Sequence, residues 1–300
     1  MAALAFTWSE FFQQITSGLA AGAIYASLAL ALVLIYRATD VVNFAQGEMA
    51  TFTTYIAWSL MDHGMSYWPV FALTLLIAFS GGIAIERVVI RPVENRPEIA
   101  IVIVTIGLLI AINGLTGWIW GADVKAFDSP FPNNTVDVAG VTISVQDIGT
   151  FCVCLATVLV LWLFFRFTTL GLAMRASAVN PGASRLLGVR VGWMLALGWG
   201  LAAVLGAVAG MMAAPTTFLD PNMMLVILIY AFAAAVLGGI DNPVGAVVGG
   251  LTLGVLVNLL GRYVAFVGEE LRLPTALAIL LAVLVVRPAG LFGRVVVRRV

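Results

Sequence analysis

Long apolar stretches alternate with short polar ones along the whole chain. A helix needs about 20 predominantly apolar residues to cross the hydrocarbon core of a bilayer. Windows of that kind fall at roughly 11–36, 44–61, 67–87, 98–120, 148–166, 192–214, 222–240, 243–261 and 273–287. The pattern predicts an all-α fold, a polytopic transmembrane bundle of about 8–9 helices, fewer if one of them is re-entrant.

Composition indicates an integral membrane protein and excludes a nucleic-acid-binding one. The sequence is 62% hydrophobic and only 10% charged, with a mean hydropathy of +1.08, whereas about a quarter of the residues in soluble domains are charged. The formal net charge is zero and Lys125 is the only lysine. No basic surface for nucleic acid can be assembled from such a chain, and membrane lipid is its expected surrounding.

The arginines predict the orientation. If successive spans alternate in direction, 12 of the 15 Lys and Arg residues lie on one side of the membrane and 3 on the other. The larger group is Arg37, Arg87, Arg91, Arg96, Arg166, Arg175, Arg185, Arg190, Arg287, Arg294, Arg298 and Arg299; the smaller is Lys125, Arg262 and Arg272. Cytoplasmic loops carry the excess of Lys and Arg, so we expect the N-terminus outside and the C-terminus in the cytoplasm.

Several catalytic classes lack their residues. His63 is the only histidine and lies in a short loop, so a His-based triad or zinc site within the membrane is excluded. A phosphate-binding loop of the type G-x-x-x-x-G-K-[ST] needs a lysine followed by Ser or Thr, but Lys125 is followed by Ala126. The sequence therefore predicts a chain that is not an enzyme, has no metal site and cannot hydrolyse ATP itself.

The stretch VVNFAQGEM, residues 41–49, places three polar side chains between two apolar segments. Asn43 and Gln46 are typical of a helix start, and Glu48 would lie near the positive end of the helix dipole. That structural role explains the residue types by itself. The functional alternative is that Asn43, Gln46 and Glu48 line a route through the membrane, with Tyr25, Thr105 and Asn113 as further candidates.

A polar loop at 166–192 is too hydrophilic to span a bilayer. Residues 172–179 and 183–187 can form two short helices around the break Asn180-Pro181-Gly182, and Gly188 ends the second. Ala, Ser and Gly between the arginines permit close approach of another backbone, with Met174, Leu186 and Leu187 as a small apolar face. Such a knob fits a groove on a partner; the alternative is a positively charged loop lying on anionic headgroups.

Two further patterns concern helix packing. Gly18 and Gly22, Gly206 and Gly210, Gly245 and Gly249, and Gly250 and Gly254 have the small-x-x-x-small spacing of close helix pairs. Residues 17–49 and 200–230 each read as a small-residue-rich helix, a polar break and a new apolar helix, in opposite directions. This predicts an inverted repeat whose breaks, 37–48 and 215–223, mark the cytoplasmic and external mouths of a route.

Four segments, in order over nearly the whole chain, carry a resemblance. GAIYASLALALVLIYRATDVVNFAQGEMA, VTIGLLIAINGL, GLAMRASAVNPGASRLLGV and RPAGLFG resemble the LivH-type permease subunits of branched-chain amino acid ABC transporters. The resemblance implies one permease domain over 1–300, with an external loop at about 121–147 and a cytoplasmic coupling loop at about 168–190. The external loop is either a solvated connector or a lip on which an outside partner docks.

In that resemblance the coupling loop contacts the ATPase through Gly171, Arg175, Ala176, Asn180, Ala183, Leu187 and Gly188. The break at Asn180 departs from the more continuous turn commoner in such loops. The implied partners are an identical or homologous permease, two ATPase subunits that bind ATP and Mg, and an extracytoplasmic substrate-binding protein. The implied cargo is branched-chain amino acids or a related solute such as urea, amides or aromatic carboxylates. The competing hypothesis is a secondary carrier or channel with Glu48 as its ion site.

Overall fold

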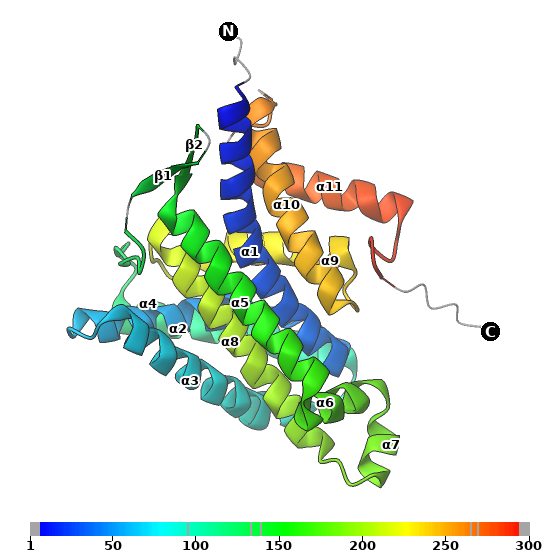
Figure 1. The fold of residues 1–300 in the computed structure, drawn as a ribbon. Helices are drawn as coiled ribbons and strands as arrows, with labels where there is room; N and C mark the ends of the chain where they lie inside the picture. The colour runs from blue at the N-terminus through cyan, green and yellow to red at the C-terminus, as the bar shows by residue number, and fades with distance from the viewer. Residues whose placement is uncertain are drawn as a thin grey trace.

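The chain folds into a bundle of long helices with one small hairpin (Figure 1). This computed structural model describes residues 7–293 except Asn95, Asn133, Ala139, Ala265 and Glu269. The α-helices are α1 (Trp8–Thr39), α2 (Gln46–Asp62), α3 (Tyr67–Ile85), α4 (Glu98–Trp120), α5 (Val145–Phe167), α6 (Thr169–Val179), α7 (Pro181–Leu186), α8 (Val191–Thr217), α9 (Met223–Gly238), α10 (Pro243–Tyr263) and α11 (Arg272–Val286). A π-helical turn η1 (Glu86–Ile90) and a 3-10 turn η2 (Arg91–Val93) extend α3, and strands β1 (Thr135–Val138) and β2 (Val141–Ser144) form the hairpin.

Each of the nine predicted spans is a helix, but the nine differ in length. Six described segments are long and apolar enough to cross a membrane: α1, α3 with its extension, α4, α5, α8 and α10. The helices α2, α9 and α11 have 17, 16 and 15 residues, which is about 23–26 Å at 1.5 Å per residue, short of a core about 30 Å thick. Two of these short helices, α2 and α9, each follow a break in the chain.

The predicted glycine pairs lie at helix contacts. A Cβ added at Gly22 would lie 2.9 Å from the carbonyl oxygen of Gly250, and one added at Gly18 would lie 2.8 Å from Val255 Cα, so α1 and α10 touch through their backbones. Gly206 and Gly210 face α2, while Gly245 and Gly249 face α9. Close backbone approach of this kind drives helix association in lipid, where no hydrophobic effect acts between helices.

Gly254→Ala should therefore destabilise the bundle, because the added methyl group meets the backbone of Gly18 and Gly22. Overpacking of this kind costs about 1–3 kcal/mol. Gly107→Ala on α4 is the matched control, since an added Cβ there has no atom within 4 Å. Thermal unfolding of the two purified variants should show a lower midpoint for Gly254→Ala alone; equal midpoints would contradict the packing assignment.

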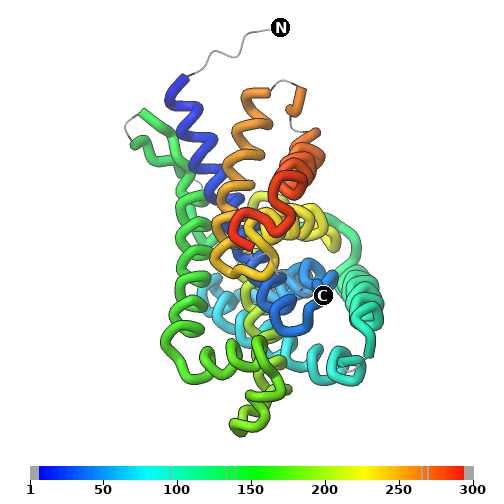
Figure 2. Tube along the Cα trace, turned by 90° about the vertical axis from the view of Figure 1, so that its right-hand side faces the viewer, coloured from blue at the N-terminus to red at the C-terminus, as the bar shows by residue number. Residues whose placement is uncertain are grey.

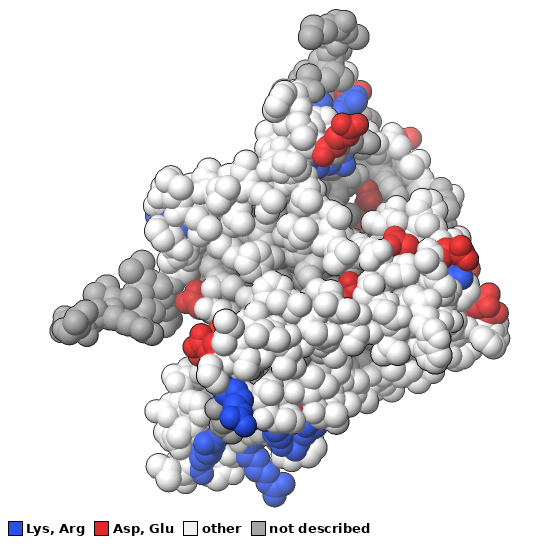
Figure 3. All heavy atoms as spheres, turned by 180° about the vertical axis from the view of Figure 1, so that it is seen from behind, with Lys and Arg blue, Asp and Glu red and all other residues white. Residues whose placement is uncertain are grey.

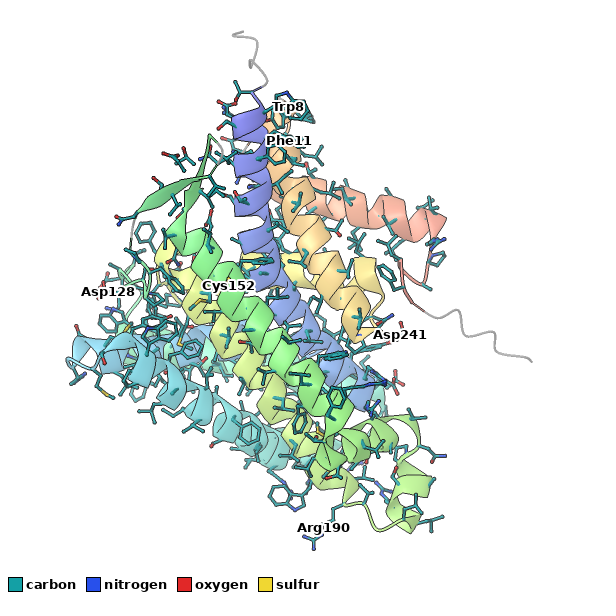
Figure 4. The ribbon with its side chains drawn as sticks, in the orientation of Figure 1. Trp8, Phe11, Asp128, Cys152, Arg190 and Asp241 are labelled. Atoms are coloured by element: carbon teal, nitrogen blue, oxygen red, sulfur yellow. The ribbon has the colours of Figure 1, made fainter. Side chains whose placement is uncertain are left out.

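The two ends of the bundle differ in charge. Figure 4 places Trp8 and Phe11 at one end and Arg190 at the other, beside α7; we name these the hairpin end and the α7 end. Figure 3 shows a broad uncharged surface with Lys and Arg gathered at the α7 end. Arg87 lies over the ring of Trp193 at 3.9 Å, which puts the end of α3 and the start of α8 on one side, as the arginine distribution predicts.

Contacts at the hairpin end agree with the prediction that the smaller group of basic residues lies on the side opposite to the larger group. Arg262 pairs with Glu10 at 3.3 Å, and Lys125 lies 4.7 Å from the ring of Trp58 at the end of α2. The relative sides of these loops therefore follow the prediction, while the absolute orientation stays a prediction. Arg294, Arg298 and Arg299 of the larger group lie outside the described residues.

The external loop at 121–147 is more ordered than the connector expected from the sequence. Its antiparallel hairpin pairs Thr135 with Ser144 and Val138 with Val141, and it lies beside the start of α1 (Figure 2). Ser17 donates to Asp147 at 2.7 Å and Ser9 to the carbonyl of Gly140 at 2.6 Å. The first bond joins α1 to the start of α5, and the second fixes the hairpin turn to α1.

Candidate functional site

The first break in the chain separates α1 from α2. Asp40 ends α1 with φ 55°, a left-handed conformation that Asp tolerates better than most residues. The side chain of Asn43 accepts from the backbone N–H of Ala45 at 3.1 Å and donates to Gln46 Oε1 at 3.2 Å. Gln46 also donates to the carbonyl oxygen of Ala202 on α8 at 2.9 Å. Both side chains are fully buried, so their polar groups hold the break together.

The second break, between α8 and α9, repeats this construction. Phe218 ends α8 with φ 61°, a conformation that costs a bulky residue about 1–3 kcal/mol. Asp220 accepts from the backbone N–H of Asn222 at 2.7 Å, as Asn43 does from Ala45. Leu219 and Lys125 exchange two backbone hydrogen bonds, each 2.9 Å long, which tie this break to the external loop.

The two breaks and the helices beside them are arranged as the predicted inverted repeat requires. The first unit consists of α1, its break and α2, and the second consists of α8, its break and α9. The helices α1 and α8 run in opposite directions in Figure 1. In addition, α1 contacts α9, and α8 contacts α2. The breaks at 40–45 and 218–222 contain the two described non-glycine residues that have positive φ. Short helices that start at breaks within a bundle are typical of transport sites near the bilayer midplane.

Asn113 of α4 contacts residues of both breaks. The expectation that the two breaks mark opposite mouths of the route is therefore wrong, because one side chain reaches both of them. Its side-chain amide nitrogen lies 3.2 Å from Glu48 Oε2, 3.2 Å from the carbonyl oxygen of Pro221 and 3.0 Å from Asn222 Oδ1. We call Glu48, Asn113 and Asn222 the junction cluster. Only 1% of Glu48 is exposed, and its Oε1 has no hydrogen-bond partner in the described part of the chain. A buried carboxylate oxygen without a donor is costly, which makes Glu48 a candidate for transient contact with a cationic group.

The other two candidates for the route make contacts with residues outside this cluster. Tyr25 stacks on Tyr230 with ring centroids 4.9 Å apart. Thr105 is buried and donates to the carbonyl of Val102 in its own helix at 2.9 Å. Asn222 is not among the candidates from the sequence. The similarity between residues 17–49 and 200–230 could have identified it, because that similarity places Asn222 in the second break.

The polar loop at the α7 end forms the two short helices expected. Thr168 caps α6, Asn180 caps α7 by accepting from the N–H of Ala183 at 2.9 Å, and Gly188 follows with φ 81°. Of the seven coupling candidates, Ala176, Asn180, Ala183, Leu187 and Gly188 are exposed, Arg175 is half-buried and Gly171 is buried. The loop thus presents small residues to the surroundings of the bundle.

Two residues of this loop face inward. A Cβ on Gly171 would lie 2.5 Å from the carbonyl oxygen of Phe164, so Gly171 is required by packing on α5. Met174 is 8% exposed, and its Cε lies near Gly198 of α8. The expectation that Met174 shares an apolar face with Leu186 and Leu187 is wrong, because α6 packs that side of its surface on the bundle. Leu186 and Leu187 remain 91% and 84% exposed.

Comparison with known proteins identifies the family. The family described as "Branched-chain amino acid transport system / permease component" matches residues 14–287. This chain belongs to that family. The permease is 32% identical to BraD of Pseudomonas aeruginosa over 97% of this chain and 98% of that protein. It is 30% identical to LivH of Escherichia coli, with the same coverage, and 28% identical to a probable LivH of Methanocaldococcus jannaschii over 89% of this chain and 87% of that protein.

Family membership decides between the two classes of transporter expected from the sequence. The permease is a multi-pass membrane component of an ABC importer. The hypothesis of a self-sufficient secondary carrier loses its support. No group of three or more metal-binding side chains occurs among the residues that the structure describes.

Proposed function

We propose that the permease imports branched-chain amino acids through the junction cluster, by alternating access. The relatives named above are branched-chain amino acid permeases. The observation that carries the mechanism is the convergence of both chain breaks on Asn113. A substrate that displaces Asn113 from Glu48 or Asn222 loosens the contact between the two units, which is the event that a rocking motion between inverted repeats requires.

The cluster can bind both the ammonium and the carboxylate group of a free amino acid. Glu48 offers a carboxylate to the ammonium group, and Asn113 and Asn222 offer amide donors to the carboxylate. Asn43 and Gln46 are committed to bonds within the break and to Ala202, so we assign them a structural role rather than contact with substrate. Tyr25 and Thr105 have no assigned role in this mechanism.

We infer three classes of protein partner. A homologous or identical permease completes the membrane part, and two ATPase subunits that bind ATP and Mg engage the exposed face of α6 and α7. A substrate-binding protein docks at the hairpin end. The complex lies in the cytoplasmic membrane of a prokaryote, with the N-terminus outside and the C-terminus inside, in agreement with the arginine distribution.

Uptake should require ATP hydrolysis by the partner subunits. In proteoliposomes that contain the assembled complex and the binding protein, labelled leucine should accumulate with ATP and not with hydrolysis-deficient ATPases, even under an imposed proton or sodium gradient. Gradient-driven uptake by this chain alone would contradict the proposal. Competition with unlabelled valine, urea and benzoate tests the substrate class. Accumulation of urea in place of leucine would change the proposed substrate but not the proposed ATP-driven mechanism.

Orientation is tested by thiol labelling in a background that lacks Cys152 and Cys154. An impermeant reagent added outside intact cells should label Asn134→Cys, which is exposed beside the hairpin, and should spare Leu186→Cys until inside-out vesicles are used. Leu186 is the better reporter than neighbouring Ser184, of which 3% is exposed. The opposite labelling pattern would reverse the orientation.

A further inference from the structure

A groove with apolar walls opens between α1, α5, α6, α8 and α10, at the side of the bundle where α1, α5 and α10 lie together (Figure 2). Its volume is about 640 Å³, within the range of about 300–1,000 Å³ typical of ligand pockets. Leu30 and Leu34 of α1 and Leu155, Leu159 and Trp162 of α5 line its apolar part. This groove is separate from the junction cluster, whose residues do not line it.

One end of the groove is cationic. Arg37 in the last turn of α1, Arg166 in the last turn of α5 and Arg175 on α6 all line it. None of the three forms an ion pair among the described residues. Arg175 Nε and Ser177 Oγ are buried there without a hydrogen-bond partner in the same set of residues. Buried donors in native proteins are almost always bonded, so the groove lacks an acceptor for them.

The groove matches one leaflet of a bilayer in length. From Leu155 to Arg166, α5 rises by about 16 Å, and half of the hydrocarbon core is about 15 Å thick. The arginines therefore lie at headgroup depth when the apolar part lies among acyl chains. An apolar helix from a protein partner would fill the deep part but would leave the guanidinium groups without an anion.

We propose that the groove binds a phospholipid with an anionic headgroup, from the leaflet at the α7 end. The phosphate accepts from Arg166 and Arg175, and one acyl chain lies along α1 and α5. Basic pockets between transmembrane helices are a known setting for such headgroups. Because Arg175 and Ser177 belong to α6, the bound lipid would fix α6 to the bundle and so set the position of the coupling loop. The binding itself does not depend on which solute is transported.

Native mass spectrometry of the detergent-purified permease tests the proposal, with phosphatidylglycerol and phosphatidylcholine of identical acyl chains added in equal amounts. Phosphatidylglycerol adducts should exceed phosphatidylcholine adducts about tenfold in the unaltered chain. Arg166→Gln/Arg175→Gln should abolish this preference. Arg96→Gln/Arg190→Gln is the matched control, because both residues are exposed arginines at the α7 end that do not line the groove; it should keep the preference.

The proposal is overturned if the two double variants lose the preference for phosphatidylglycerol equally, or if the unaltered chain has no such preference. Either result would mean that the groove binds anionic lipid no better than the rest of the basic surface. A second measurement is independent of the folding of the variants. Phosphatidylglycerol with a photoreactive acyl chain, incorporated into membranes with the complete transporter, should label α1 and α5 within the groove. If instead Leu159→Cys forms a disulfide with a cysteine introduced in the partner permease and no lipid label appears there, the groove is a protein interface.

Discussion

Ala183→Trp is expected to release the ATPase subunits from the permease while leaving membrane insertion intact. Ala183 is the N3 residue of α7, and its exposed side chain lies among other small residues of the loop. A Trp side chain there would hold the ATPase surface away from the backbone, and overpacking of a close contact costs about 1–3 kcal/mol. Since the loop lies outside the apolar spans, the helices themselves should be unaffected.

The measurement is co-purification of the ATPases together with leucine uptake. Ile103→Trp is the control for bulk, because Ile103 is 63% exposed and lies on the apolar helix α4, outside both proposed docking faces. It should retain both ATPases and uptake driven by them. Retention of coupled uptake by Ala183→Trp would place the ATPase contact elsewhere, with the exposed Leu186 and Leu187 as the next candidates.

Asn113→Leu should abolish most uptake without releasing the ATPases. The substitution removes the donor that joins Glu48 to Pro221 and Asn222. A hydrogen bond to a charged group contributes about 1.5–3 kcal/mol. The equilibrium constant for the contact between the two breaks should therefore fall roughly 10- to 100-fold. We expect uptake to fall at least about tenfold, and the midpoint of thermal unfolding to fall as well, because the Glu48 carboxylate is left buried without a donor.

The double variant Asn113→Leu/Glu48→Gln separates a substrate contact from a structural one. Removing the charge should recover part of the thermal stability, and uptake should stay low because the ammonium loses its carboxylate. Glu48→Gln by itself keeps the shape of the helix start, so assembly with the ATPases should be intact. Recovery of uptake together with stability in the double variant would show that the cluster only holds the two breaks together.

Local patterns in the sequence predict the helices well and their mutual contacts less well. The nine apolar windows become helices because each can bond its backbone internally, as lipid requires. The start of α2 and the break before α9 are predictable because Asn43 and Asp220 favour backbone turns over helix continuation. The contact of Asn113 with Glu48 and Asn222 joins residues that are 65 and 109 positions apart in the chain, and no local pattern specifies it.

Two expectations fail for different physical reasons. The sequence of α6 does not specify which of its sides packs on α8, so it does not reveal that Met174 is buried. Thr135–Val138 and Val141–Ser144 alternate apolar and polar residues around Gly140, which is a hairpin signal. The Asp, Asn and Pro residues around it favour loops, so the sequence of 121–147 as a whole predicts a connector.

The bond between Gln46 and Ala202 has a consequence for biogenesis. The two residues are 156 positions apart, so at about 5–20 residues per second the ribosome needs roughly 8–30 s to supply the partner after Gln46 has been made. During that time the start of α2 carries Gln46 without its hydrogen-bond acceptor on α8. We expect nascent chains that end before Val191 to hold this segment at the water interface, accessible to quality-control proteases, and to become resistant only once α8 has been inserted.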